Sequence, residues 1–326
     1  MSDDPYAPLA AHGIHRLSIP TPFAVGRVNL YLIEDDPLTL VDAGPNSGTS
    51  LDELDQQLRA LGRSIPDIER IVITHQHIDH IGLVRIVAER SGAEVVALDR
   101  LVPFVESYSA EAAADDEFAT EAMLRHGIPE DVASALRSVS QAFRAWGSRA
   151  DVTRVVAAGD RLEFAGRSLE VHFRPGHSPT DTVFLDAARG MLIGGDHLLA
   201  SISSNPLISR PRGRKALIEY MESLARTREM DVELVLPGHG DPVDDHRALI
   251  DARLRLHARR ADKIHLLIAE RPRSAYELAQ AMWGNVAVTQ AFLTLSEVLG
   301  HTDLLTRDGR VAEEEDGRGH VVFRAT

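Results

Sequence analysis

Residues 74–80 read THQHIDH and are the most informative segment of this sequence. It ends a run of isoleucine and valine, so residues 68–74 are predicted to form a strand. Four potential metal ligands stand within six residues of one another: His75, His77, Asp79 and His80. They cannot all point one way from a strand or a helix, whereas a loop at a strand end can aim them at one point. Imidazole and carboxylate groups together suit zinc, iron or another divalent ion, and a surface loop with histidines by coincidence is the weaker interpretation.

Three further candidates stand in comparable places. His177, Asp196 and His239 each lie in or beside a glycine-containing segment that follows a predicted strand. Taken singly, each is more often an ordinary turn residue. Taken with the first cluster, they complete a set of five histidines and two aspartates, which is enough for two metal ions.

Composition narrows the possible functions. The 326 residues carry 49 acidic against 35 basic side chains, a net charge of −14, and no cysteine. The missing cysteines exclude thiolate nucleophiles and cysteine-ligated metals, and the acidic balance disfavours nucleic acid as a partner. The first ten residues, MSDDPYAPLA, have no basic and apolar leader pattern, and no run of about 18 apolar residues predicts a membrane span. We therefore expect a cytoplasmic protein that does not enter a membrane.

The pattern along the chain predicts two β-rich halves followed by a small helical region. Strands are expected at 28–33, 38–41, 68–74 and 93–98, and again at 154–156, 161–164, 168–173, 182–185, 191–193 and 233–236. Helices are expected at 51–61, 81–91, 215–227, 274–282 and 289–299. Residues 101–150 predict a helical insertion, divided near Gly127 and Pro129. Three helices and a final hairpin beyond residue 246 favour a winged-helix-like module.

The combined motif, His75-x-His77-x-Asp79-His80 with His177, Asp196 and His239 in that order, resembles the metallo-β-lactamase superfamily of hydrolases, of the glyoxalase II and β-lactamase-like type. The resemblance spans about residues 15–245. It implies an α/β fold, an αββα sandwich with the metals at one edge. The expected division is a catalytic domain over 1–245, with its insertion at about 101–150, and a winged-helix-like domain over 246–326.

The resemblance also implies the ligand set for two divalent ions. His75, His77 and His177 would hold the first, Asp79, His80 and His239 the second, and Asp196 would bridge them. Zinc is the expected metal, with iron and manganese as alternatives. Asp79 and Asp196 are the candidate catalytic residues, and Asp42, Thr74 and His197 are candidates for a supporting layer around the ligands.

The activity implied is attack by metal-bound hydroxide on a thioester or carboxylic ester. A metal-dependent RNA nuclease and a lactone hydrolase are the alternatives, and a regulatory protein that works through its winged helix is a third. Leu199 stands where quorum lactonases of the family carry a tyrosine, and Thr180 replaces a common glycine after the third histidine. The predicted helix at 289–299 has no lysine or arginine, which disfavours a DNA-reading role.

Two features bear on the substrate. Arg210, Arg212, Arg214 and Lys215 form a local basic cluster that could bind a carboxylate or the phosphates of coenzyme A, or could be a solvated loop. The insertion carries large apolar residues that could form a lid over an acyl chain or pack as its own core: Phe104, Tyr108, Phe118, Met123, Phe143 and Trp146. We expect a small, anionic acyl substrate, and a homodimer through the C-terminal module is a further hypothesis.

Overall fold

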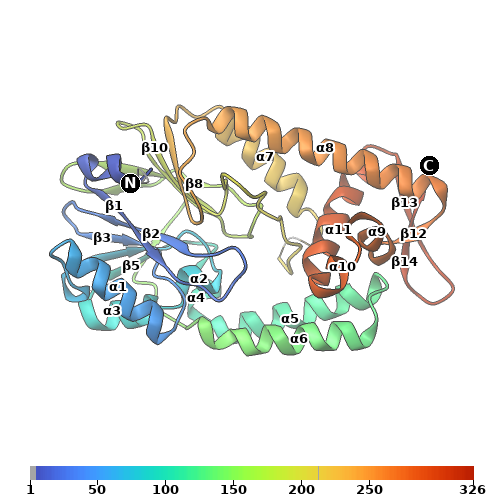
Figure 1. The fold of residues 1–326 in the computed structure, drawn as a ribbon, viewed down its shortest axis with the longest axis horizontal. Coiled ribbons are helices and arrows are strands. Elements are labelled where there is room, and N and C mark those ends of the chain that lie inside the picture. Colours follow the sequence, from blue (N-terminus) through green and yellow to red (C-terminus); the bar gives the residue numbers. More distant parts are fainter. Residues whose placement is uncertain (1–4, 212) are drawn as a thin grey trace.

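A computed structural model describes residues 5–211 and 213–326. Two β-sheets lie face to face, and helices cover the outer face of each (Figure 1). The buried side chains between the sheets form one apolar core, to which both contribute. This is the αββα layering that the resemblance implied. Within the described residues, no helix is both long and apolar enough to cross a lipid bilayer.

The first sheet has six strands in the order β1-β2-β3-β4-β5-β6. They are β1 (Ile14–Ile19), β2 (Val28–Ile33), β3 (Thr39–Val41), β4 (Arg70–Val72), β5 (Glu94–Leu98) and β6 (Arg154–Val156). Strands β3 to β6 pair in parallel, whereas β1, β2 and β3 pair antiparallel. Parallel strands end at the same edge of a sheet, so Asp42 after β3 and the segment 74–80 after β4 meet there.

The second sheet has five strands in the order β11-β10-β9-β8-β7. They are β7 (Arg161–Glu163), β8 (Ser168–Phe173), β9 (Thr182–Asp186), β10 (Met191–Gly195) and β11 (Leu234–Pro237). Strand β9 is antiparallel to both β8 and β10, and β10 is parallel to β11. Strands β8, β10 and β11 therefore share one direction, and the loops that carry His177, Asp196 and His239 leave from one edge.

Helices complete the outer layers. The first sheet is accompanied by η1 (Ala7–His12), α1 (Gly48–Ala60), η2 (Ile65–Asp67), α2 (Ile78–Ile81) and α3 (Val84–Ser91), and the second by α7 (Ala216–Arg228) and α8 (His246–Glu270). Helix α1 begins where the Ser47 side chain accepts a hydrogen bond from the Ser50 amide, and it buries Leu54 and Leu58. On the other side, Tyr220 and Leu224 of α7 belong to the same apolar cluster as the outer face of the second sheet.

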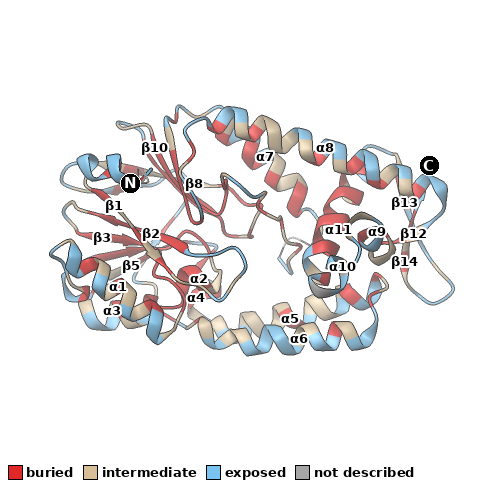
Figure 2. Cartoon of the chain, in the orientation of Figure 1, coloured by how far each residue is buried: buried red, intermediate tan, exposed pale blue. Residues whose placement is uncertain are grey.

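The insertion between β5 and β6 comprises α4 (Val102–Glu106), α5 (Tyr108–Arg125), α6 (Glu130–Phe143) and η3 (Arg144–Trp146). Helices α5 and α6 form a hairpin that extends from the first sheet to the C-terminal helices (Figure 1). Its far end joins their apolar core through Met123, Ile128 and Ala133. Much of the hairpin is only half-buried or exposed, in contrast with the strands (Figure 2).

The C-terminal region contains the second half of α8, then β12 (Arg273–Ser274), α9 (Ala275–Trp283), α10 (Val286–Thr289), α11 (Ala291–Arg307), β13 (Val311–Glu315) and β14 (Val321–Ala325). Its three strands form a separate sheet in the order β12-β14-β13. Helix α8 serves both regions, because Ile250 packs in the cluster beside the second sheet and Ile264 in the C-terminal core. The division at residue 245 and the winged-helix assignment stay predictions.

Candidate metal centre

The structure brings all seven predicted ligands to the edge where the two sheets present their carboxyl ends. Each ligand lies directly beyond a strand or in the short α2 helix: His75 and His77 after β4, Asp79 and His80 on α2, His177 after β8, Asp196 after β10 and His239 after β11. All seven side chains are buried or half-buried. The site is therefore assembled from strand-end loops that are far apart in the sequence.

Three imidazoles face one another at one side of this cluster. Nδ1 of His77 lies 3.0 Å from Nε2 of His75 and 2.9 Å from Nε2 of His177. Burial and the neighbouring imidazoles hold the pKa of His75 and the pKa of His177 well below the usual value, so both rings are neutral at pH 7. Neutral imidazole nitrogens that converge on one point are suited to a divalent transition metal.

Asp79, His80 and His239 form a second such group beside the first. Oδ2 of Asp79 lies 3.3 Å from Nε2 of His239. Burial alone disfavours a carboxylate, yet the hydrogen bond with His239 and the nearby imidazoles hold the pKa of Asp79 below its usual value. Asp79 is therefore ionised and available as a negatively charged ligand.

Asp196 lies between the two groups. Its carboxylate oxygens lie 3.5 Å from Nε2 of His177 and 3.6 Å from Nε2 of both His80 and His239. These separations exceed a normal hydrogen bond. Nε2 of His80 and Oδ1 of Asp196 are buried and have no hydrogen-bond partner among the described residues. Buried polar atoms that face one another without a partner fit metal ions, which would satisfy both.

Asp42 and Thr74, both expected to support the ligands, lie behind His75 and His80 and hydrogen-bond to them. Oδ2 of Asp42 accepts a hydrogen bond from Nδ1 of His80 at 2.7 Å and another from the Thr74 hydroxyl at 2.8 Å. The same hydroxyl lies 3.0 Å from Nδ1 of His75. In both histidines Nδ1 is thus engaged, and Nε2 is directed at the centre. Burial opposes the charged form of His80, but the Asp42 and Asp196 carboxylates outweigh it and raise its pKa to about 10, so a metal ion that binds at Nε2 would displace the proton held there.

The loop of His239 is held by hydrogen bonds to Arg27, Asn29 and Tyr31, which no sequence motif identifies as site residues. Nδ1 of His239 donates to the carbonyl oxygen of Arg27 at 2.8 Å, which leaves Nε2 for the centre. The carbonyl oxygen of Pro237 accepts from the Tyr31 hydroxyl at 2.7 Å and from the Asn29 side chain at 3.0 Å. In the sequence, only Asn29, a polar residue within the largely apolar strand β2, indicates this role.

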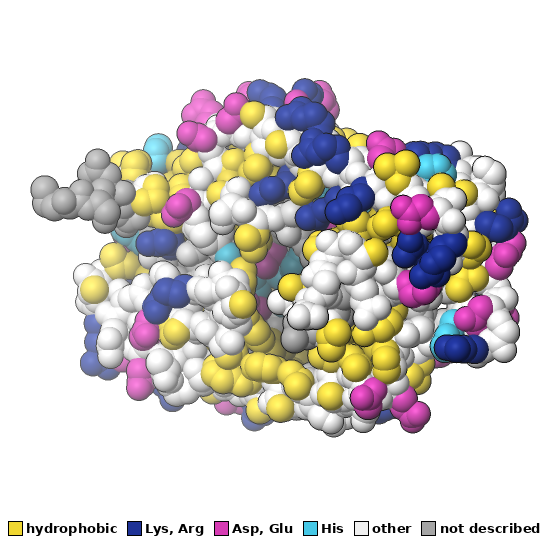
Figure 3. Space-filling view, turned by 45° about the vertical axis from the view of Figure 1, so that its right-hand side comes forward, with side chains coloured by type: hydrophobic (Ala, Val, Ile, Leu, Met, Phe, Trp, Pro, Cys, Tyr) yellow, Lys and Arg dark blue, Asp and Glu magenta, His cyan; other side chains and the backbone are white. Residues whose placement is uncertain are grey.

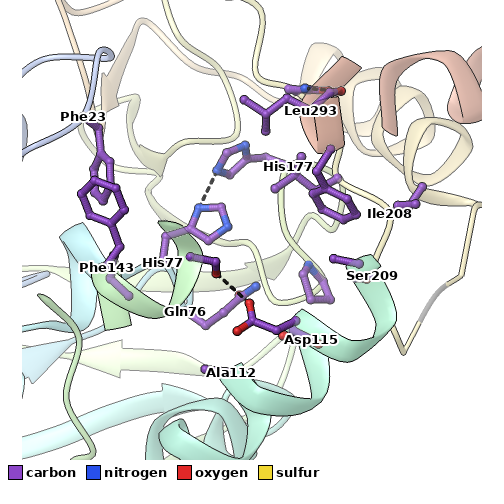
Figure 4. A pocket seen from close by; sticks show the side chains of 18 of the residues that line it. Phe23, Gln76, His77, Ala112, Asp115, Phe143, His177, Ile208, Ser209 and Leu293 are labelled. Atoms are coloured by element: carbon purple, nitrogen blue, oxygen red, sulfur yellow. Dashed lines mark hydrogen bonds between the residues drawn. The ribbon is translucent and has the colours of Figure 1, made fainter. Parts of the chain in front are cut away.

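The ligand cluster opens into a pocket of about 670 Å³. Figure 3 shows histidine and acidic side chains at the base of a hollow, with hydrophobic side chains gathered beside it. Phe23 and Phe143 form one wall, with ring centroids 5.4 Å apart, and Ile208 and Leu293 lie across the pocket (Figure 4). The walls are thus largely apolar, contributed by the insertion, the loop at 199–209 and α11.

Residues 24–239 match the model of the metallo-beta-lactamase superfamily, a span that includes all seven clustered ligands. The chain belongs to this superfamily. A curated relative, named "Probable metallo-hydrolase YqjP", of Bacillus subtilis (strain 168), is 32% identical over 308 residues, which is 92% of this chain and 94% of the relative. Both the family and the α/β fold expected from the sequence are confirmed, and the chain is a metallo-hydrolase.

Two solved structures of superfamily proteins resemble this one over almost their whole length. A metallo-beta-lactamase family protein of Thermus thermophilus is 26% identical with a TM-score of 0.80, and 97% of this chain and 99% of that chain are covered. A beta-lactamase domain protein of Burkholderia ambifaria is 27% identical with a TM-score of 0.85, covering 96% of this chain and 92% of that one. The likeness therefore includes the insertion and the C-terminal region.

The structure corrects two expectations about residues around this superfamily site. The His197 ring turns away from the centre and is fully buried, with Nε2 2.9 Å from the Thr227 hydroxyl of α7. His197 therefore supports the packing of α7 and contacts no ligand side chain among the described residues. Its position directly after Asp196 was misleading, because consecutive side chains point in different directions.

The basic cluster is the second correction. Arg210 forms ion pairs with Glu111 and Asp115 of α5, and Arg214 pairs with Asp303 and Glu313 of the C-terminal region. Neither lines the metal pocket, and Lys215 borders a different cavity together with Arg214. Arg212 lies outside the described residues. Because the charges of Arg210 and Arg214 are balanced by these ion pairs, the structure gives no support to an anion site beside the metal ligands.

Replacing Asp42 with asparagine is expected to lower metal affinity and activity about 10- to 100-fold, a typical effect of losing a hydrogen-bond partner of a ligand. Asp42 has a positive φ of 59°, which asparagine tolerates, so the backbone should keep its shape. An amide nitrogen in the place of Oδ2 can accept a hydrogen bond from neither Thr74 nor His80. Titration with zinc under a competing chelator measures the affinity. Thr74→Ser, which keeps the hydroxyl, should stay close to wild type, and equal losses in both variants would contradict this role.

Proposed function

We propose that this chain hydrolyses a thioester or carboxylic ester that carries an apolar acyl group, at a site for two divalent metal ions, zinc by preference. His75, His77 and His177 would hold one ion, and Asp79, His80 and His239 the other. Bound divalent ions lower the pKa of water and stabilise the negative charge that develops on a carbonyl oxygen. A lactone hydrolase and an RNA nuclease are the competing proposals.

The chain's own residues divide the work. Asp196, between the two ligand groups, would supply negative charge that offsets the charge of bound cations. Asp42 and Thr74 hold His80 and His75 with their Nε2 atoms toward the centre. Asp79, also a pocket-lining carboxylate, is placed to accept a hydrogen bond from the attacking water. The apolar walls position the acyl group and keep bulk water away.

The observation that carries the proposal is the apolar pocket beside the ligand cluster. His77, His177, Asp79, Asp196 and His239 border the same cavity as the aromatic side chains of the insertion. The insertion is placed for both uses that the sequence left open, because Phe118 and Phe143 line the pocket and Met123 also packs in the C-terminal core. A pocket of this size and lining suits a small organic acyl group.

The same lining argues against RNA. Among the described residues, the pocket-lining carboxylates Glu111, Asp115 and Asp116 form ion pairs with Arg210 and Arg144, so the lining offers no continuous track of free basic side chains for a phosphodiester backbone. Arg144 also lines the pocket but is paired with Asp116, whereas no ion pair is seen for Arg137 among the described residues. If the substrate carries an anionic group, Arg137 is its best partner. Leu199 presents an apolar wall where the resemblance places a tyrosine in quorum lactonases, which weakens the lactone alternative.

A series of acyl thioesters of increasing chain length tests the acyl pocket. Each methylene that enters the pocket should stabilise the transition state by about 0.8 kcal/mol. This raises kcat/KM about fourfold for each methylene until the pocket is full. Ala112 lies on the pocket side of α5 (Figure 4), so Ala112→Phe should reduce kcat/KM for the longest chains at least about tenfold and spare the acetyl thioester.

Ala110→Phe is the matched control, since Ala110 lies on the same helix but is exposed and does not line the pocket. It should leave the whole series unchanged. A wild-type kcat/KM that does not depend on chain length, or an Ala112→Phe variant that lowers all substrates equally, would argue against an acyl pocket.

A further inference from the structure

A second group of potential metal ligands lies in the C-terminal region, outside the site described above. His257 projects from α8, and Glu297 and His301 project from α11. His257 and His301 are fully buried, and Glu297 is only 7% exposed. Glu297 and His301 are four residues apart and therefore share one face of their helix. One ligand atom from each residue lies within 4.8 Å of the other two.

The spacing of the two imidazoles fits coordination. Nδ1 of His257 lies 3.4 Å from Nε2 of His301. This is longer than a usual hydrogen bond from an N–H group, at about 2.7–3.2 Å. Two nitrogens bound at about 2.05 Å to one tetrahedral zinc ion are about 3.3 Å apart. The observed separation is therefore close to that of two ligands of one ion.

The orientation of His301 fits as well. Its Nδ1 lies 2.6 Å from the backbone carbonyl oxygen of Glu297, which can only accept, so Nδ1 carries the proton. Nε2 then presents a lone pair toward His257. Histidines that bind metals commonly donate their other N–H in this way. Arg260 donates to Oε1 of Glu297, and the carboxylate lies in the same group as the two imidazoles.

We propose that His257, Glu297 and His301 bind one divalent transition-metal ion, zinc by preference, as a structural site separate from the catalytic centre. Two imidazoles and a carboxylate are a suitable ligand set for zinc. The ion would join α8 to α11. One turn before His257, Arg253 donates from Nη2 to the carbonyl oxygens of Leu199, Ala200 and Ile202 at 2.9–3.2 Å. The ion would therefore stiffen the helix that holds this pocket loop.

The metal content of the full-length protein tests the site. Wild type and the double variant His257→Asn/His301→Asn are loaded with excess zinc, gel-filtered and measured by elemental analysis. Wild type is expected to keep one more zinc ion per chain than the double variant. His126→Asn is the matched control, because His126 is buried beside Phe323 of the C-terminal core but belongs to none of the ligand groups, and it should keep the wild-type count.

Equal zinc content in wild type and a folded double variant would overturn the site. If the double variant does not fold, the zinc content of Glu297→Gln is measured instead, and it should be lower than that of wild type. Anomalous diffraction from wild-type crystals at the zinc edge is the second measurement. A peak between His257 and His301 supports the site, and its absence refutes it. Thioester hydrolysis by the double variant, expected within about twofold of wild type, is scored separately. Failure of the structural site thus leaves the proposed hydrolysis untouched.

Discussion

Replacing Asp196 with asparagine is expected to lower kcat/KM by about a thousandfold or more. Asp196 is the one ligand whose carboxylate faces imidazoles of both groups, His177 on one side and His80 and His239 on the other. Asparagine keeps the shape but removes the negative charge that offsets two closely spaced cations. We therefore expect the metal content at the centre to fall together with the activity, measured by elemental analysis and by hydrolysis of a thioester.

Asp186→Asn is the matched control for this loss. Asp186 is a buried aspartate on the neighbouring strand β9, where it pairs with Arg189 and lies away from the ligands. Its replacement should reduce stability but leave the activity of the folded protein close to wild type. If Asp196→Asn kept full metal content and full turnover, Asp196 would not bridge the two ligand groups.

Replacing Gly238 with alanine is expected to reduce activity at least about a hundredfold, although Gly238 is not itself a ligand. A Cβ atom there would lie 2.3 Å from Oδ1 of Asp196 and 2.8 Å from Cε1 of His80. Neither neighbour can move without leaving the position that the centre requires. The expected signature is weakened zinc affinity, measured by competition with a chelator.

Gly48→Ala provides the comparison for this prediction. Gly48 begins α1, and a Cβ there would meet no atom of the described residues within 4 Å, so the variant should behave as wild type. If Gly238→Ala bound zinc as tightly as wild type, the loop must be able to relax around the added methyl group. Close packing at Gly238 would then not be what maintains the ligand geometry.

The ligands could be predicted from the sequence because each one sits in a local pattern. An apolar run followed by a glycine-containing segment marks a strand end, and the histidines and aspartates at several such ends together make up a complete ligand set, although each alone would be an ordinary turn residue. Strand β1 was not among the predicted strands, because its buried residues Ile14, Leu17 and Ile19 do not alternate regularly with polar ones. The helix predicted at 81–91 is in fact two, α2 and α3, with Asp79 and His80 inside the first.

The features that the sequence could not give depend on partners far along the chain. The charges of Arg214 could not be assigned without knowing that Asp303 and Glu313 lie beside it. Helix α11 continues past Gly300, where the prediction ended it, because that glycine lets α11 approach Leu217 of α7. The position of the insertion opposite α11, which creates the pocket, likewise follows from tertiary packing and leaves no local signal.

Release of thiol from an acyl thioester, measured with and without bound metal, tests whether the chain hydrolyses thioesters at this metal centre. The chain has no cysteine, so a thiol reagent reports only the product. We expect turnover by the zinc-loaded protein, its loss after a chelator removes the metal, and its return when zinc is added again. Absence of turnover by fully metal-loaded protein across the whole acyl series, or turnover that survives complete removal of the metal, would contradict thioester hydrolysis at this centre.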